Sequence, residues 1–368
     1  MKKQMLIVLF VTLTSIMFTT ALSSPVSTFA QSRGSEPDIT IDAATRLQVI
    51  EITLKQLNDN YVFPEVAKQI DIAIRERLRR KEYDQITNPA TLAEVLTAQL
   101  REISHDKHMS VGFYAKPLPP PPSQSQETPE ERDKRRNIAS LSNFGFNRVE
   151  RLSGNVGYLN LDTFWWLEEG GGDTAVAAMN FLANTNALII DLRDNRGGDP
   201  AMVALLASYF FDSEPVELSG LYWRPSDSLQ RSFTLPYVPG KRYLNKEVFI
   251  LTNKETFSAG EAFAYDLKNL KRATLIGETT AGGANPRTGY PINRNFIVFV
   301  PTGRAVSPIT KTNWEGIGVK PDIAVPTEQS LNTAHLIALK KLLAAATDEE
   351  TRKRLKSFIE TSERQQSQ

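Results

Sequence analysis

Residues 248–277 read VFILTNKETFSAGEAFAYDLKNLKRATLIG, and this stretch contains the pattern that decides the fold. The run Val248–Thr252 is almost continuously apolar, as expected for a strand buried on both faces of a sheet. Ser258–Leu270 carries apolar residues at helical spacing, and Ala273–Gly277 is a second short apolar run. A strand, a helix and another strand in this order predict parallel pairing in an α/β layered domain.

The same alternation continues on both sides of this stretch. Strands are predicted over Val156–Leu161, Ala187–Asp191, Asn295–Val300 and Ile323–Val325, and helices over Thr174–Leu182 and Met202–Phe211. We therefore expect an α/β core over residues 141–330. A helix over Thr333–Ala346 and a charged, frayed tail are expected to follow it, over residues 331–368.

The region before the core has a different pattern. Apolar stripes at helical spacing near residues 47–57, 66–78 and 92–103 predict a small helical domain over residues 41–113. Residues 114–140 are rich in proline, serine, glutamine and mixed charge, so they have little apolar area to bury. This second segment is predicted to be an exposed linker.

The first thirty residues have the pattern of a secretory signal. Lys2 and Lys3 precede the mostly apolar run Met5–Leu22, and small residues flank a cleavage position before Gln31. Residues 1–30 are thus predicted to be a cleaved signal peptide and residues 31–40 a flexible entry. The expected location is periplasmic or extracellular, without stable membrane insertion after cleavage. The alternative is an uncleaved anchor, since the apolar run is near the ~17–25 residues of a spanning helix.

Composition excludes several kinds of chemistry. The 368 residues include no cysteine, which rules out disulfides, thiol nucleophiles and iron–sulfur clusters. With 43 basic and 42 acidic residues, the formal net charge of +1 gives no sign of a nucleic-acid partner. Imidazole chemistry must use His105, His108 or His335. No metal is predicted, because His105 and His108 lack an evident third ligand.

Ser258 lies between a predicted strand and a predicted helix, where two roles are possible. Glu261 follows three residues later, which is the spacing of a capping box. A nucleophile would suit the same position, because backbone N–H groups at the start of a helix can stabilise an oxyanion. The two interpretations are compatible.

Two further segments carry candidate residues. The loop Asp191–Gly198 follows a predicted strand, and its glycines permit a close backbone approach, so Gly197 or Gly198 is a candidate oxyanion donor. The alternative is an ordinary turn. Glu315 lies between an aromatic residue and a glycine, and it is either the acid that orients an imidazole or a surface carboxylate in a turn.

Together these segments resemble the tail-specific, or C-terminal-processing, serine peptidases. The resemblance runs from about residue 42 to 327 and is closest to the branch with the tricorn core domain and the interphotoreceptor retinoid-binding protein modules. It depends on FSAGE at 257–261, ATLIGETTAGG at 273–283, DLRDNRGG at 191–198 and GIGVKPD at 316–322. The resemblance implies a crotonase-like or Clp-protease-like ββα core.

The resemblance also implies roles for individual residues. Ser258 matches the family nucleophile, and the N–H groups of Ala259 and of Gly197 or Gly198 would form the oxyanion hole. Gly283 stands where the processing proteases have their lysine base, so a Ser–Lys dyad is not expected.

The tricorn-like branch uses a histidine with a carboxylate behind it, and His108 and Glu315 fall at those positions. Two features depart from the relatives. Lys107 stands where the tricorn pattern has a serine, and the region after the helices is too short for a PDZ domain.

The predicted function is that of an exported serine peptidase that cleaves unfolded or short polypeptides and needs no cofactor. The alternative from another class is a noncatalytic binder of an apolar ligand or peptide on the same scaffold. An esterase with the same triad is a weaker possibility, because no Gly-x-Ser-x-Gly elbow is present at Ser258.

Overall fold

The computed structural model describes residues 39–118 and 128–366. The predicted signal peptide, and nearly all of the predicted entry segment, lie outside these residues. Within the described ranges, no helix combines the length and the apolar character needed to cross a membrane.

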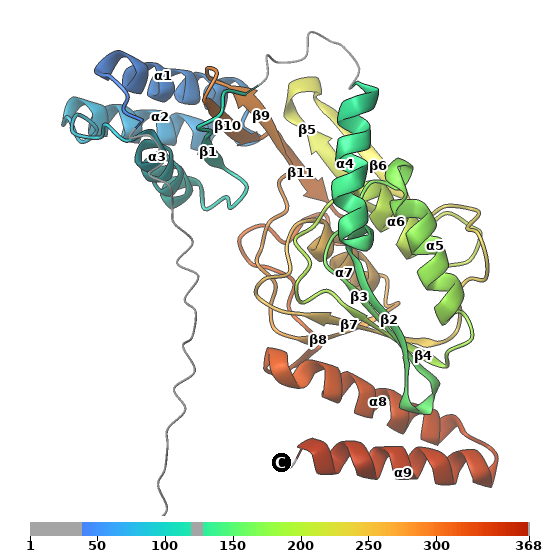
Figure 1. Cartoon of the computed structure of the whole chain (residues 1–368). Coiled ribbons are helices and arrows are strands. Elements are labelled where there is room, and N and C mark those ends of the chain that lie inside the picture. The colour runs from blue at the N-terminus through green and yellow to red at the C-terminus, as the bar shows by residue number, and fades with distance from the viewer. Residues whose placement is uncertain (1–38, 119–127, 367–368) are drawn as a thin grey trace, which may run out of the picture. The chain divides into compact units, whose positions relative to one another are not determined.

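A six-stranded sheet forms the centre of the α/β core (Figure 1), with the strand order β12-β8-β7-β4-β3-β2. Its strands are β2 (Phe146–Leu152), β3 (Val156–Leu161), β4 (Ala187–Asp191), β7 (Glu247–Thr252), β8 (Thr274–Gly277) and β12 (Ile323–Ala324). β2 is antiparallel to β3, and all the other pairs are parallel. The predicted mixed α/β fold with an N-terminal helical region is confirmed.

The inner strands β3, β4 and β7 are buried on both faces, which explains their continuous apolar runs. On one face, Leu188 and Ile190 of β4 pack in a core with α5 (Gly171–Leu182), α6 (Pro200–Ser208) and α7 (Ala259–Asn269). On the other face, Ile189 packs in a core with α8 (Ser330–Ala345) and α9 (Glu349–Gln366). Alternate residues of one strand thus serve two cores.

The prediction of a frayed tail is wrong, because α9 occupies most of it. Leu355 and Ile359 lie one helical turn apart, and both are buried in the core that α9 shares with α8. These two apolar residues are surrounded by charged ones in the sequence, so their helical stripe is narrow.

The N-terminal region consists of α1 (Ala43–Asn60), α2 (Pro64–Arg79), α3 (Pro89–Ser104) and β1 (Ser110–Phe113). The three helices follow the predicted stripes, but they do not pack as a separate domain. β1 pairs antiparallel with β10 (Phe296–Pro301), which in turn pairs with β9 (Arg287–Pro291). Val298 and Val300 of β10 lie in the same apolar core as the helices. A late segment of the chain therefore completes the N-terminal region.

The predicted linker is also corrected, since its second half contains α4 (Pro129–Leu141). Thr128 and Glu131 form a capping box, and Pro129 occupies the first helical position, where its missing N–H has no intrahelical role. Only Ala139 of this helix is buried. Residues 119–127 of the predicted linker lie outside the described residues.

A third sheet, which no apolar alternation in the sequence predicts, has the order β11-β5-β6. It consists of β5 (Glu217–Trp223), β6 (Ser228–Phe233) and β11 (Gly303–Val306). Residues of β5, β6 and β11 line one side of a cavity beside Ser258. This small sheet therefore belongs to the surroundings of the candidate site.

Candidate active site

Ser258 lies in the loop after β7, immediately before α7, and its backbone is strained. Its φ of 54° and ψ of −117° are rarely adopted by a residue with a side chain. Such a conformation costs about 1–3 kcal/mol and persists only where its surroundings hold it. The backbone N–H of Ser258 donates to Glu261 Oε2 at 2.9 Å. Gly197 packs against the serine so closely that a Cβ there would lie 2.8 Å from Ser258 Cβ.

Glu261 does more than cap a helix. Its buried carboxylate also accepts from Thr280 Oγ1 at 2.5 Å and from the backbone N–H groups of Gly282 at 2.6 Å and Gly283 at 2.8 Å. Burial raises the pKa of Glu261, while the hydrogen bonds it accepts act in the opposite direction. The carboxylate thus joins the serine turn to the loop 280–283.

His108 approaches Ser258 from the N-terminal region, in the loop between α3 and β1. Its Nε2 lies 3.3 Å from Ser258 Oγ, across 150 positions of sequence. Its backbone N–H donates to Asp106 Oδ1 at 3.0 Å, and its ring stacks on Phe257 with the ring centroids 4.4 Å apart. A Cβ at Gly283 would lie 2.8 Å from His108 Cε1 and would collide with the Phe257 ring. The stacked imidazole therefore requires glycine at position 283.

The imidazole is in its neutral form, so one ring nitrogen is free to accept a proton. Burial, together with the positive charges of Arg287 and Arg101, lowers the pKa of His108 to about 4. The ring is consequently neutral at pH 7. A neutral histidine within hydrogen-bond reach of a serine hydroxyl is the arrangement that general-base catalysis needs.

Glu315 lies behind His108 in a group that we call the Glu315 cluster, which comprises Asp106, His108 and Glu315. One potential ligand atom from each of these residues lies within 4.8 Å of the other two. Glu315 Oε2 accepts from the Ala284 N–H at 2.5 Å. Glu315 Oε1 and His108 Nδ1 are both buried, and neither has a hydrogen-bond partner among the described residues.

Asp106 is the residue of this cluster that sequence reasoning misses. Its Oδ2 accepts from Tyr61 Oη at 3.3 Å and from Asn285 Nδ2 at 2.8 Å. Burial raises the pKa of Glu315 to about 8, and the negative charge of Asp106 adds to this shift. The three potential ligand atoms are close enough together to bind a cation. Both carboxyl groups, however, already accept hydrogen bonds from the protein. The one sequence signal was an acid two positions before His108.

The structure distinguishes between the two glycines, Gly197 and Gly198, that the sequence offers as alternative oxyanion donors. The Gly197 N–H donates to Asn195 Oδ1 at 2.9 Å, so it is not available to a ligand. No hydrogen bond to a described residue engages the N–H of Gly198 or of Ala259. Both residues border the cavity beside Ser258. The available pair is therefore Ala259 and Gly198.

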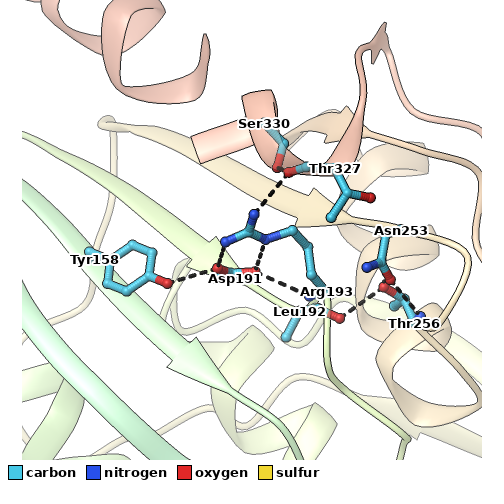
Figure 2. Close-up of polar contacts among 8 residues, drawn as sticks. All are labelled: Tyr158, Asp191, Leu192, Arg193, Asn253, Thr256, Thr327 and Ser330. Atoms are coloured by element: carbon cyan, nitrogen blue, oxygen red, sulfur yellow. Dashed lines mark hydrogen bonds and ion pairs between the residues drawn. The ribbon is translucent and has the colours of Figure 1, made fainter. Parts of the chain in front are cut away.

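A second acidic group, the Asp191 cluster, comprises Tyr158, Asp191 and Arg193 at the carboxyl end of the sheet (Figure 2). Asp191 accepts from Tyr158 Oη at 2.7 Å, from Arg193 Nε at 2.9 Å and from Arg193 Nη2 at 2.6 Å. Nearby, Thr256 Oγ1 donates to the Leu192 carbonyl at 2.8 Å. This last bond fastens the loop before Ser258 to the loop that leads to Gly198.

The other two histidines lie away from the serine. His105 ends α3 in a left-handed conformation with a φ of 55°. His335 lies on α8, where its Nε2 is 2.9 Å from the Ser153 carbonyl oxygen. Of the three histidines, His108 alone contacts Ser258.

Comparison with family models finds matches in both halves of the chain. Residues 155–325 match the model of peptidase family S41. Residues 42–142 match the model of the N-terminal domain of these peptidases in eukaryotic IRBP. The two matches together include every residue that forms the site described above.

Curated relatives are similar over about half of this chain. The chloroplastic carboxyl-terminal-processing peptidase 2 of Arabidopsis thaliana is 28% identical over 178 residues, which are 47% of this chain and 32% of the relative. The carboxy-terminal-processing protease of Bartonella bacilliformis is 28% identical over 180 residues, which are 48% of this chain and 40% of the relative. The match thus spans less than half the length of either relative.

Solved structures share the fold at low sequence identity. A lipoprotein from Streptococcus agalactiae superposes with a TM-score of 0.54 at 14% identity, over 80% of this chain and 96% of that one. The photosystem II D1 C-terminal processing protease has a TM-score of 0.50 at 16% identity, over 78% of this chain and 94% of that one.

Proposed function

Because the chain belongs to peptidase family S41, we propose that it is a serine peptidase with Ser258 as nucleophile and His108 as general base. The observation that carries the proposal is the 3.3 Å separation of His108 Nε2 and Ser258 Oγ, with an imidazole that is neutral at pH 7. This separation is slightly longer than a strong hydrogen bond, as is common for catalytic pairs without substrate.

The proposed reaction has two halves. His108 removes the hydroxyl proton as Ser258 attacks a peptide carbonyl, and the resulting oxyanion accepts from the N–H groups of Ala259 and Gly198. The start of α7 adds the positive end of a helix dipole at the same place. His108 then protonates the leaving amine, and water hydrolyses the acyl-enzyme by the same route.

Glu315 is proposed to orient the imidazole. Neutral His108 can accept from Ser258 at Nε2 only if its proton is on Nδ1, and that proton then needs an acceptor. Glu315 Oε1 is buried, unpaired among the described residues and part of the same cluster. A small shift of the side chain, or one bridging water, would join the two atoms.

The proposed substrates are unfolded or short polypeptides outside the cytoplasm. Export rests on the sequence pattern of residues 1–30, and the substrate class rests on family membership. No cofactor or metal is used in the proposed mechanism, because serine, histidine and backbone amides supply each step.

The test is the Ser258→Ala variant, assayed for cleavage of an unstructured, fluorescently quenched peptide. We expect cleavage and covalent labelling by a fluorophosphonate probe to be lost, with an unchanged circular dichroism spectrum. Ser357→Ala on α9 is the matched control, because this exposed serine lies on a different element, and it should retain both signals. Undiminished cleavage by purified Ser258→Ala would refute the nucleophile assignment.

One observation favours a second candidate, a noncatalytic binder of an apolar ligand or peptide. A cavity of about 250 Å³ with largely apolar walls lies directly beside Ser258. A binder would show neither labelling nor cleavage in the wild type, and it would copurify with an apolar ligand.

A further inference from the structure

The cavity beside Ser258 has apolar walls and an acidic end. Val203, Leu221, Trp223 and Trp314 contribute to its walls, and Asp266 also lines it. Its volume of about 250 Å³ is many times the ~10–15 Å³ that a cavity needs to hold one water. The cavity is therefore large enough for one long side chain.

One face of α7 runs along this cavity. Ala259, Ala262 and Asp266 are spaced at i, i+3 and i+7, so they follow one another on the same side of the helix. At 1.5 Å per residue, Asp266 lies about 10 Å beyond Ala259 along the helix axis. The two alanine methyl groups leave the space between the serine and the acid open.

Asp266 is buried without a cation. Asp266 is only 4% exposed, and its carboxylate accepts hydrogen bonds from Ser219 Oγ at 2.6 Å and from the Ser219 N–H at 3.1 Å. No lysine, arginine or histidine among the described residues forms an ion pair with it. Burial raises the pKa of Asp266 to about 6. An uncompensated carboxylate in such surroundings is costly, and a bound cation would offset the cost.

We propose that this cavity binds the substrate side chain on the acyl side of the cleaved bond, and that Asp266 selects lysine or arginine there. The inference rests on the proposed function, because the cavity borders the nucleophile and both candidate oxyanion donors. The apolar walls contact the methylene stem, and the carboxylate pairs with the cationic head. An acid at the end of an apolar specificity pocket selects basic residues by this means.

The length of the cavity adds to the selection. A short apolar side chain leaves the carboxylate with no partner besides Ser219, while a long neutral one desolvates it without pairing. Norleucine has the methylene stem of lysine without the ammonium group, so a comparison of lysine and norleucine peptides isolates the contribution of the charge. A site that pairs with a substrate group discriminates strongly against the analogue without it.

The experiment compares peptides that differ only at this position, carrying lysine, arginine or norleucine. We expect the wild type to show kcat/KM values for lysine and arginine at least tenfold above norleucine. In Asp266→Asn, which keeps an acceptor for Ser219, the ratio should fall to within about twofold. Equal or better cleavage of the norleucine peptide by the wild type would overturn the inference, as would an unchanged ratio in Asp266→Asn.

A binding measurement separates this inference from the peptidase assignment. The same peptides, labelled with a fluorophore, are titrated into Ser258→Ala protein and followed by anisotropy. Tighter binding of the lysine peptide supports the inference even if no cleavage is found in the wild type, and equal affinities contradict it.

If Asp266→Asn fails to fold, Ala262→Leu provides a second test. The larger side chain obstructs the cavity between Ser258 and Asp266 and should abolish the lysine preference. A preference that survives Ala262→Leu likewise contradicts the inference.

Discussion

The Asp191 cluster and the Glu315 cluster are both buried and acidic, yet they are satisfied to different degrees. In the Asp191 cluster, Arg193 neutralises the carboxylate, and both carboxylate oxygens accept hydrogen bonds. The Glu315 cluster combines two carboxylates and a neutral imidazole, with no cation paired to either acid in the described part of the chain. It also holds two of the unpartnered buried polar atoms, Glu315 Oε1 and His108 Nδ1.

This difference indicates that the Asp191 cluster stabilises the fold and that the Glu315 cluster can take part in proton transfer. A fully satisfied buried network holds one geometry, because any rearrangement breaks bonds that nothing replaces. A cluster with unpaired atoms and shifted pKa values can move protons, which is why such groups concentrate at reactive sites. Substitutions in the first cluster should therefore alter stability, and substitutions in the second should alter activity.

The largest expected effect is the loss of activity in His108→Ala. Removing the base should lower kcat/KM by roughly 10,000-fold, or about 5 kcal/mol of transition-state stabilisation. Peptide cleavage measures the loss, and thermal unfolding checks that the fold is retained. Loss of the stacked ring removes packing, while loss of the unpaired buried nitrogen offsets part of that cost, so the protein should remain folded. A loss of less than tenfold would show that another group is the base.

Next in size is the loss of stability in Arg193→Ala. This change leaves Asp191 buried without its cation, which should lower the free energy of unfolding by roughly 3–5 kcal/mol. Urea unfolding measures it. Arg196→Ala is the control, since Arg196 pairs with Glu255 at the surface and should contribute at most about 1 kcal/mol. Equal effects of the two variants would contradict the distinction between buried and exposed pairs.

A smaller effect on activity is expected for Gly283→Ala. The new methyl group would displace the stacked rings of Phe257 and His108, and a displacement of about 1 Å can reduce the rate roughly 100-fold. Steady-state kinetics with the quenched peptide tests this. The control is Gly172→Ala on α5, whose methyl group would meet only the backbone of Leu167. Full activity of Gly283→Ala would mean that the site tolerates a displaced imidazole.

The smallest expected effect is a shift in pH dependence. His108 with a pKa of about 4 must be neutral to act, so activity should fall only below about pH 4. Glu315 with a pKa of about 8 becomes ionised as the pH rises, so kcat/KM should increase through that value. Asp106→Asn removes a charge that raises the pKa of Glu315, so this increase should move to lower pH. Profiles of kcat/KM from pH 3.5 to 10 measure both the fall at low pH and the increase near pH 8. If the increase stays at the same pH in Asp106→Asn, the charge of Asp106 does not raise the pKa of Glu315.

Local pattern predicts the inner strands of the central sheet well, because strands buried on both faces leave continuous apolar runs, but it does not predict the largely exposed edge strand β2. β3 and β4 have the predicted bounds. The same reasoning fails where burial is slight. β6 has no buried residue and α4 has one, so neither leaves an apolar stripe to detect.

Local pattern identifies Ser258 as a candidate from the turn before α7, and the family resemblance selects His108 and Glu315. Their contacts depend on tertiary structure, which pairs segments far apart in the chain. The bond between Gly197 and Asn195 illustrates the limit. The sequence of a glycine-rich loop does not show which of two adjacent backbone N–H groups will donate to a side chain of the same loop.

The pairing of β1 with β10 has a consequence for the order in which the site forms during synthesis. His108 lies two residues before the start of β1, while β10 ends only at Pro301. A nascent chain halted between Ser258 and Phe296 would contain both members of the 3.3 Å pair but not the strand that holds β1 in place. The strand that holds the loop of His108 beside Ser258 would therefore be complete only once residue 301 of the 368 had been synthesised.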